Sequence, residues 1–256
     1  MATIQEIHKT HLQMLRFFDD FCEQNGLRYV MAGGTMLGAY RHHGFIPWDD
    51  DVDLYRPIED AKKFQKCFQS EEYCLQTPET DFEAPYIMFR IRKKGTRMIQ
   101  KPVEEYVNIN KGIWMDIFLY TNAGKTAFAK KLQLFTMRIL QSFRCRFYHA
   151  RCHKKKILHA VLAKLPRSAA LLFDDFLSRL ICLLGNESSG EVFVWEVVDP
   201  YFWPQNVIDR RLRYCFEGVE LWGMEDYNAY LSQSYGEDYM TPKKWGHFSD
   251  YSEVQP

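Results

Sequence analysis

The chain has 256 residues, with 33 Lys and Arg against 33 Asp and Glu, so its formal net charge is zero. This balance argues against a strongly basic nucleic-acid binder, whose affinity comes from many phosphate contacts, and against a disordered acidic tail. We therefore expect no nucleic-acid partner. Hydrophobic residues make up 46% of the chain, which is enough for a sizeable core in one large domain or two small ones.

Cysteine use and the N-terminus bear on the compartment. Seven cysteines without regular spacing favour a reduced, intracellular protein. The first residues lack the apolar segment of a secretory signal, and charged residues break the most apolar stretch, 157–184, so no membrane span is predicted. We expect a cytoplasmic protein, or one placed at the cytoplasmic face of the membrane.

Short strands and helices are mixed in the first half of the chain. Apolar residues at three- or four-residue steps predict a helix over 4–22, which Asn25-Gly26 ends. A short strand over 27–32 follows, and then a helix that Thr35 caps and that runs to His42. The later elements predicted here are a helix over 58–69 and strands over 52–55, 73–76, 86–92, 103–109 and 113–120.

The second half is helical first and richer in strands later. The helical periodicity begins at Gly124 and is divided by Pro166, and short aromatic strands with one helix near 225–234 come last. We expect an α+β protein with a mixed sheet, folded as one compact unit. Its expected parts are a core over 1–123, a helical insertion over 124–190 and a C-terminal part over 191–256 that packs on the core.

The strongest local signal lies in residues 32–54, AGGTMLGAYRHHGFIPWDDDVDL. A strand runs into Gly33-Gly34, where no side chain obstructs the backbone, and the helix that follows presents unpaired N–H groups and the positive end of its dipole. Such a terminus binds phosphate. Gly33, Gly34 and Thr35 are therefore candidate substrate-binding residues. The alternative is an ordinary strand-to-helix turn.

Four carboxylates follow within five residues, those of Asp49, Asp50, Asp51 and Asp53. If this segment is extended, Asp51 and Asp53 emerge on one face, where two carboxylates repel each other unless a cation lies between them. Hard oxygen ligands suit Mg²⁺ or Mn²⁺. A solvated acidic turn is the alternative, and we disfavour it because Trp48 and apolar residues flank the run.

Asp116 is the expected third member of this metal site. It stands alone in the apolar run 113–118, where a charge is costly unless it is paired or binds a metal. We therefore predict that Asp51, Asp53 and Asp116 are both metal ligands and catalytic residues. The alternative for Asp116 is a structural ion pair with an arginine.

Two segments carry six positive charges each and no acid. In the first, 90–101, Arg90 and Arg92 alternate on one strand face and are predicted to bind a phosphate of the substrate. The second, 144–156, is interpreted as a surface helix, with contact to an anionic acceptor or to the inner membrane surface as the alternative. It also contains four potential zinc ligands whose spacing lacks a paired motif, so the sequence leaves a metal there open: Cys145, His149, Cys152 and His153.

Three residues between the glycines and the aspartates complete the candidate substrate site. Arg41 is a candidate for neutralising charge on a transferring group, and His42 for contacting a phosphate or acting as an acid or base. Trp48 is a candidate for a cation–π contact with a cationic head group, with core packing as the alternative.

These segments closely resemble the LicD/fukutin-related family of phosphotransferases. The resemblance covers most of the chain and is weakest over 121–190. It rests on Gly33-Gly34-Thr35, Leu37-Gly38-Ala39, Arg41-His42 and residues 44–54, and it continues in 93–96, 112–118, 216–218 and 235–240 with Pro242 and His247.

The resemblance implies a nucleotidyltransferase-like core that moves a phospho-alcohol, most often phosphocholine from CDP-choline, onto a hydroxyl of a cell-surface glycan, lipopolysaccharide or teichoic acid precursor. It implies that Asp51 and Asp53 bind the divalent ion and that Asp116 joins them or serves as the base. The alternatives are transfer of the nucleotide instead, a donor with glycerol, ribitol or ethanolamine, and a catalytically inactive binding module, against which the three intact aspartates speak.

Overall fold

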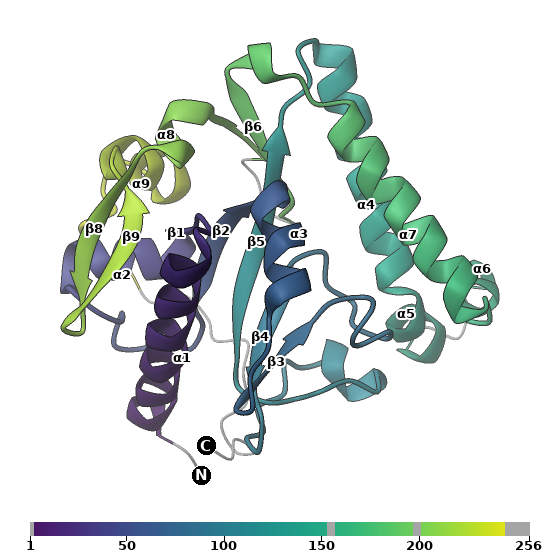
Figure 1. The fold of residues 1–256 in the computed structure, drawn as a ribbon, viewed down its shortest axis with the longest axis horizontal. Helices are drawn as coiled ribbons and strands as arrows, with labels where there is room; N and C mark the ends of the chain where they lie inside the picture. The colour runs from purple at the N-terminus through teal and green to yellow at the C-terminus, as the bar shows by residue number, and fades with distance from the viewer. Residues whose placement is uncertain (1–2, 153–156, 197–200, 244–256) are drawn as a thin grey trace.

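The computed structural model describes residues 3–152, 157–196 and 201–243. In Figure 1 a mixed sheet fills the middle of the molecule, with α1 (Ile4–Asn25) and α3 (Ile58–Cys67) in front of it. A group of helices stands to its right, and a two-stranded hairpin with a further helix stands to its left. This mixture agrees with the expected α+β class.

The central strand of the sheet is β5 (Trp114–Asn122), whose residues are buried except for the last. The strand β2 (Asp53–Pro57) pairs with one edge of β5 in parallel. On the other edge β4 (Phe89–Lys93) and β6 (Glu191–Val194) pair with it in the antiparallel sense, one after the other along its length. The outer strands of the sheet are β1 (Val30–Met31), β3 (Tyr73–Gln76) and β7 (Phe202–Pro204).

The alternation of side chains along β2 sorts its residues onto two faces of the sheet. Arg56 lies on the face covered by α1 and α3, with its guanidinium 4.8 Å from the ring centre of Phe18 and 4.5 Å from that of Phe64. Asp53 and Tyr55 lie on the opposite face, where the Tyr55 ring meets Tyr230 of α9 (Tyr227–Tyr235). The acidic residues therefore belong to the face away from α1 and α3.

The expected helical segment lies between β5 and β6 in the chain. It contains α4 (Ala127–Arg144), α5 (Arg146–Cys152), α6 (Ile157–Leu162) and α7 (Arg167–Leu183). The helix α7 begins directly after Pro166, as the sequence predicts. After β7 come α8 (Gln205–Asp209), β8 (Arg211–Phe216), β9 (Val219–Met224) and α9.

One predicted strand and one predicted helix cap are wrong. Residues 103–109 are not a strand, because Val103–Tyr106 forms the 3₁₀ helix η1. Thr35 does not cap a helix either: α2 (Gly33–His42) begins two residues earlier, with Ala32 as its N-cap and no side-chain cap. The Thr35 hydroxyl instead accepts a hydrogen bond from the backbone N–H of Asp53 (2.9 Å).

All seven cysteines are free thiols in the structure. Among the helices that the structure describes, none combines the length and the apolar character needed to cross a bilayer.

Candidate active site

The acidic segment is anchored between α1 and the sheet. On one side the His8 ring stacks on Phe45, with 4.3 Å between ring centres, and its Nε2 donates to the backbone carbonyl of Asp49 (2.6 Å). On the other side the backbone N–H of Asp116 donates to the carbonyl of Val52 (2.8 Å), so the parallel ladder starts before β2 itself. These contacts fix the backbone of the acidic run.

Three carboxylates of this run converge. Asp49, Asp50 and Asp51 each present an oxygen within 4.8 Å of the other two, and the part of the chain that the structure describes contains no other such group of metal-ligand residues. The predicted set was Asp51, Asp53 and Asp116, so the two sets share Asp51 alone. Both oxygens of Asp116 accept hydrogen bonds from Arg90 instead.

Asp53 and Asp116 nevertheless lie side by side. They are directly paired in the register of the parallel strands β2 and β5, and paired residues of parallel strands point to the same face. The face that contains Asp53 therefore also contains Asp116, as the sequence predicts for a pair of carboxylates on neighbouring strands.

Burial and mutual repulsion perturb two of these groups. The pKa of Asp51 is raised well above its usual range, first by desolvation and then by the charges of Asp49, Asp50 and Asp116. The pKa of Asp53 is raised in the same way, by desolvation and then by Asp51 and Asp116. Such a cluster is stable in its charged form only if a cation neutralises it.

The donor set fits a hard divalent cation. All the side chains that converge are carboxylates, which are the ligands that Mg²⁺ and Mn²⁺ prefer. The raised pKa values of Asp51 and Asp53 are the signature of carboxylates held together without a counter-charge. The residues present are thus suited to the predicted ion.

The two glycines lie directly over the carboxylates. Gly33 has φ of +49°, and a Cβ added to it would lie 2.5 Å from Oδ2 of Asp53. A Cβ on Gly34 would collide with Oδ2 of Asp49. Only glycine at both positions lets the start of α2 approach the acidic residues this closely.

Only part of the glycine turn is available for the substrate-binding role that the sequence predicts. The N–H of Gly33 already donates to the hydroxyl of Tyr230 (2.8 Å), and Thr35 is buried with its hydroxyl on the Asp53 backbone. The main contribution of this turn that the structure reveals is to bring a helix N-terminus, the positive end of its dipole, against the carboxylates.

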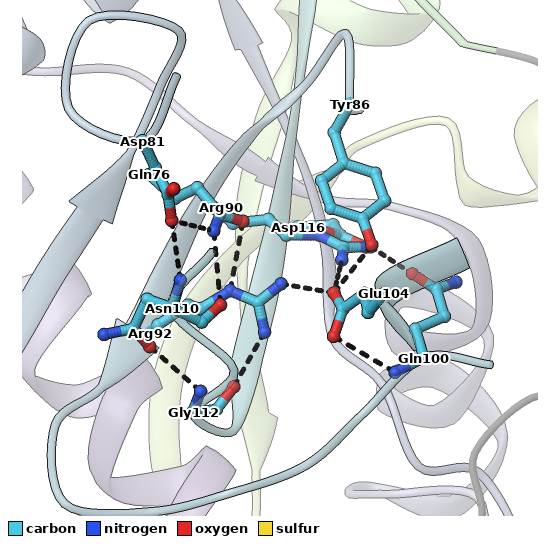
Figure 2. A network of polar contacts seen from close by, with 10 residues as sticks. All are labelled: Gln76, Asp81, Tyr86, Arg90, Arg92, Gln100, Glu104, Asn110, Gly112 and Asp116. Atoms are coloured by element: carbon cyan, nitrogen blue, oxygen red, sulfur yellow. Dashed lines mark hydrogen bonds and ion pairs between the residues drawn. The ribbon is translucent and has the colours of Figure 1, made fainter. Parts of the chain in front are cut away.

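Arg90 and Arg92 share one strand face, as predicted, but their predicted contact with a phosphate is not what the structure presents. Figure 2 shows both guanidinium groups inside a network of protein acceptors. Arg90 donates to both oxygens of Asp116 (2.5 and 3.0 Å) and to Glu104 (3.0 Å). Arg92 donates to Glu104 (2.5 Å), to Gln76 (3.0 Å) and to the carbonyl of Gly112 (2.9 Å).

Arg90 is therefore a structural partner of Asp116, and Arg92 joins the same network through Glu104. Their side chains are 1% and 0% exposed, and each guanidinium nitrogen has a protein acceptor. The ion pair that stood as the alternative for Asp116 is thus present. It orients the Asp116 carboxylate beside Asp53 and does not remove it from the acidic face.

The other predicted substrate residues lie along α2 and after it. Arg41 is seven residues after Gly34, two helical turns along the same face, and donates to the carbonyl of Tyr239 (2.7 Å). Its Nε donates to Nε2 of His42 (2.9 Å), and desolvation followed by the charge of Arg41 lowers the pKa of His42. Trp48 is half-buried and packs against the hydrophobic core.

A residue that the sequence did not single out also belongs to this face. Glu196, just after β6, accepts a hydrogen bond from the Tyr55 hydroxyl (2.8 Å). Tyr55 in turn accepts from Tyr230 (3.3 Å), which accepts from Gly33, so a chain of hydrogen bonds joins Glu196 to the glycine turn. Burial raises the pKa of Glu196 to about 7. Nothing in the local sequence of Glu196 signals this placement.

The Cys and His residues of the second basic segment form no comparable site in the described part of the chain. The thiol of Cys145 donates to the carbonyl of Pro85 (3.3 Å), and the His149 ring lies 4.7 Å from that of His159. His153, one of the four potential zinc ligands, lies outside the described residues.

The fold and the site define an α+β protein with carboxylates on two parallel strands and directly before one of them, and with a glycine-led helix above them. Residues 26–145 match the family model described as the LicD/FKTN/FKRP nucleotidyltransferase domain. The chain is also 28% identical over 255 residues to lipopolysaccharide cholinephosphotransferase LicD of Haemophilus influenzae, which covers 93% of this chain and 91% of that protein. These matches show a LicD-type domain over residues 26–145 and a similarity to a LicD protein along nearly the whole chain.

Shorter matches reach proteins of eukaryotes. Ribitol 5-phosphate transferase FKRP of Homo sapiens is 49% identical over 46 residues, which is 18% of this chain and 9% of that protein. Mannosyltransferase regulator 4 of Saccharomyces cerevisiae is 26% identical over 120 residues, which is 44% of this chain and 10% of that protein.

Proposed function

We propose that this protein transfers a phospho-alcohol, phosphocholine from CDP-choline, to a hydroxyl group of a cell-surface glycan such as a lipopolysaccharide precursor, and that the reaction depends on Mg²⁺ or Mn²⁺. The observation that carries the proposal is the group of carboxylates on β5, on β2 and directly before β2, in which burial and mutual repulsion raise the pKa values of Asp51 and Asp53. The match to the LicD-type domain and the similarity to a cholinephosphotransferase support the phosphotransferase class.

The chemistry is a substitution at phosphorus. The acceptor hydroxyl oxygen forms a bond to the phosphorus that carries the alcohol, the bond from that phosphorus to the bridging oxygen breaks, and CMP leaves. The hydroxyl proton passes to a carboxylate of the site. Catalysis of this kind depends mainly on positioning and on neutralising the charge of the transferred group.

Each part of the site has a proposed role. Asp51 and Asp53 hold the divalent ion, with Asp116 beside them in the position that Arg90 sets. When bound, the ion supplies positive charge for the diphosphate of the donor. Gly33 and Gly34 let the start of α2, the positive end of its dipole, lie against these carboxylates.

The acceptor proton requires a base with a pKa near neutrality. Glu196 meets this requirement, since its pKa is about 7 and it is linked through Tyr55 and Tyr230 to the glycine turn. We propose Glu196 for this step in preference to Asp116, because both oxygens of Asp116 are occupied by Arg90.

The donor is supported by the relative that aligns over nearly the full length, a cholinephosphotransferase by name. The shorter match, to a ribitol 5-phosphate transferase, favours CDP-ribitol as the second candidate. Both donors release CMP, and the acidic site is the same for either.

The test is a CMP-release assay with purified protein, Mg²⁺, a cell-surface glycan fraction and a panel of CDP-alcohols. Release from CDP-choline and not from CDP-ribitol, CDP-glycerol or CDP-ethanolamine supports the proposal, and release from CDP-ribitol alone replaces the donor. Incorporation of the nucleotide into the acceptor would reveal a nucleotidyltransferase instead. Absence of turnover with every donor and with either metal would overturn the proposal.

A further inference from the structure

The exposed apolar side chains of this protein gather on its helical segment. Of the 13 large hydrophobic side chains that are exposed among the described residues, ten lie on α4, α6 and α7. Several are largely in solvent, with Phe128 at 76%, Leu172 at 71% and Leu183 at 80% exposure. We call these ten residues the helical face: Phe128, Phe135, Ile139, Ile157, Leu158, Val161, Leu172, Phe173, Phe176 and Leu183.

Helical periodicity aligns these residues into stripes. On α4 Phe128, Phe135 and Ile139 follow each other at intervals of seven and four residues, which places them on one side of the helix. On α7 Leu172 and Phe176 are four residues apart and Leu183 follows seven later, so they too share one side. Each helix therefore has an apolar stripe in addition to the side that it buries against the core.

The two stripes adjoin each other. The helices α4 and α7 pack side by side (Figure 1) and run in opposite directions, because the Gln133 amide contacts the carbonyl of Ile181 and Arg144 pairs with Asp174. At their seam the rings of Phe143 and Phe173 meet at 4.9 Å. Phe143 lies one turn beyond the α4 stripe, and Phe173 lies three residues before Phe176, so this ring pair connects the stripes.

Charge distinguishes the helical segment from the remainder of the chain. Residues 124–190 contain 13 Lys and Arg and three acidic residues, within a protein of zero formal net charge. Two of those acids are engaged, since Asp174 binds Arg144 and Asp175 binds Arg179. The exposed side chains of Lys131, Arg138 and Lys164 have no carboxylate partner among the described residues.

An apolar stripe flanked by unbalanced cations matches one kind of partner, a bilayer with anionic head groups. Apolar helix faces embed at the boundary between head groups and acyl chains, and Lys and Arg beside them are attracted by the negative surface potential. A second copy of this chain fits poorly, because a symmetric contact would bring two strongly positive segments together.

We propose that the helical face of α4, α6 and α7 docks this protein on the surface of an anionic membrane. The helices lie in the plane of the surface, with Phe135 and Phe176 in the apolar boundary and with Lys131 and Arg138 near lipid phosphates. This proposal does not depend on the identity of the CDP-alcohol donor.

The test is co-sedimentation of the full chain with phosphatidylcholine vesicles, with and without phosphatidylglycerol. We expect binding to the anionic vesicles that weakens as salt is raised, and much weaker binding to phosphatidylcholine alone. The double variant Phe135→Asp/Phe176→Asp should lose at least about tenfold in vesicle affinity. Leu212→Asp is the matched control, since Leu212 is 49% exposed on β8, outside the helical face, and this variant should bind like the wild type.

A second pair of variants guards against misfolding of the first. Lys131→Glu/Arg138→Glu changes only exposed cations and should also weaken anionic vesicle binding by about tenfold or more. Circular dichroism and gel filtration verify the fold and the oligomeric state of each variant. Equal binding to both kinds of vesicle, no binding to either, or wild-type dimers that Phe135→Asp/Phe176→Asp converts to monomers would overturn the proposal.

Discussion

Asp53 of β2 and Asp116 of β5 occupy directly paired positions of a parallel ladder, on the same face of the sheet. A parallel pair brings together segments that are distant in sequence, and here it adds a carboxylate from the middle of the chain to the acidic run that begins at Asp49. Gly33 closes over Asp53 from the start of α2. The geometry of the site therefore depends on the register of β2 against β5. Substitutions of the residues that support this geometry have specific expected effects.

The first prediction concerns the arginine that holds Asp116. Arg90→Met should reduce the free energy of unfolding by about 3–5 kcal/mol, because it leaves the buried Asp116 and Glu104 carboxylates without this partner. Urea unfolding measures the loss. Arg151→Met is the control, since it breaks a pair with Glu83 in which the arginine is 44% exposed, and it should cost less than about 1 kcal/mol. Equal losses in the two variants would argue against a special role of the buried network.

The second prediction separates backbone strain at a glycine from crowding of the carboxylates. Gly33 and Gly95 both have positive φ, at +49° and +77°, so alanine at either position costs about 1–2 kcal/mol of backbone strain. At Gly95 the new Cβ meets nothing within 4 Å, whereas at Gly33 it meets Oδ2 of Asp53 at 2.5 Å. Gly33→Ala should therefore lose additional stability and most of its transferase activity, while Gly95→Ala stays active.

The third prediction is a pH dependence of stability. Burial raises the pKa of Glu196 from 4.5 to about 7. Between these values the unfolded chain has released the proton and the folded chain still holds it, so this group's contribution to stability decreases as pH rises from about 4.5 to about 7. The slope is at most about 1.4 kcal/mol per pH unit. Glu196→Gln should flatten this part of the curve.

The same residue affects the pH profile of the reaction. If Glu196 accepts the acceptor proton, kcat/KM rises with pH through about 7, and Glu196→Gln abolishes that rise. Tyr55→Phe should move the rise to higher pH, because the Tyr55 hydroxyl donates to Glu196 and lowers its pKa. An unchanged profile in Glu196→Gln would assign the base to another residue.

The fourth prediction concerns the metal. Mg²⁺ should raise the Tm of the wild type at pH 8 and should raise it less at pH 5, because protons compete for Asp51 and Asp53, whose pKa values are raised. Asp51→Asn should be more stable than the wild type without Mg²⁺, since it removes repulsion with Asp49 and Asp116, and should gain little from the ion. A shift of Tm by Mg²⁺ of the same size in this variant would place the ion elsewhere.

Local patterns in the sequence were sufficient for much of the fold. The period of apolar residues predicts α1, and the isolated apolar runs predict β3 and most of β5. The segment 103–109 is rich in apolar residues and is predicted as a strand, but these residues do not alternate as a strand requires. The structure makes a 3₁₀ turn there, from which Glu104 reaches Arg90 and Arg92. That turn is stabilised by distant partners, which local propensity does not contain.

The acidic residues of the candidate site can be picked out in the sequence, and their surroundings cannot. The spacing of Asp51 and Asp53 and the lone Asp116 are visible in the sequence, since each breaks an apolar pattern. The partners of Arg90 and Arg92 are not visible in the sequence. Nothing in the segment 90–101 distinguishes these two arginines from its four other cations, and only the folded sheet buries them. Glu196 is not recognisable in the sequence either, because only the pairing of β6 with β5 brings it near Tyr55.

The most direct test of the central claim is CMP release from CDP-choline by matched aspartate variants. Asp51 and Asp53 are the proposed metal ligands, whereas Asp175 of α7 is 51% exposed, pairs with Arg179 and lies outside the acidic run, so it is the matched control. We expect Asp51→Asn and Asp53→Asn each to lose about 100-fold or more in Mg²⁺-dependent turnover, and Asp175→Asn to stay within about tenfold of the wild type. Turnover by Asp51→Asn and Asp53→Asn at the wild-type rate would contradict it.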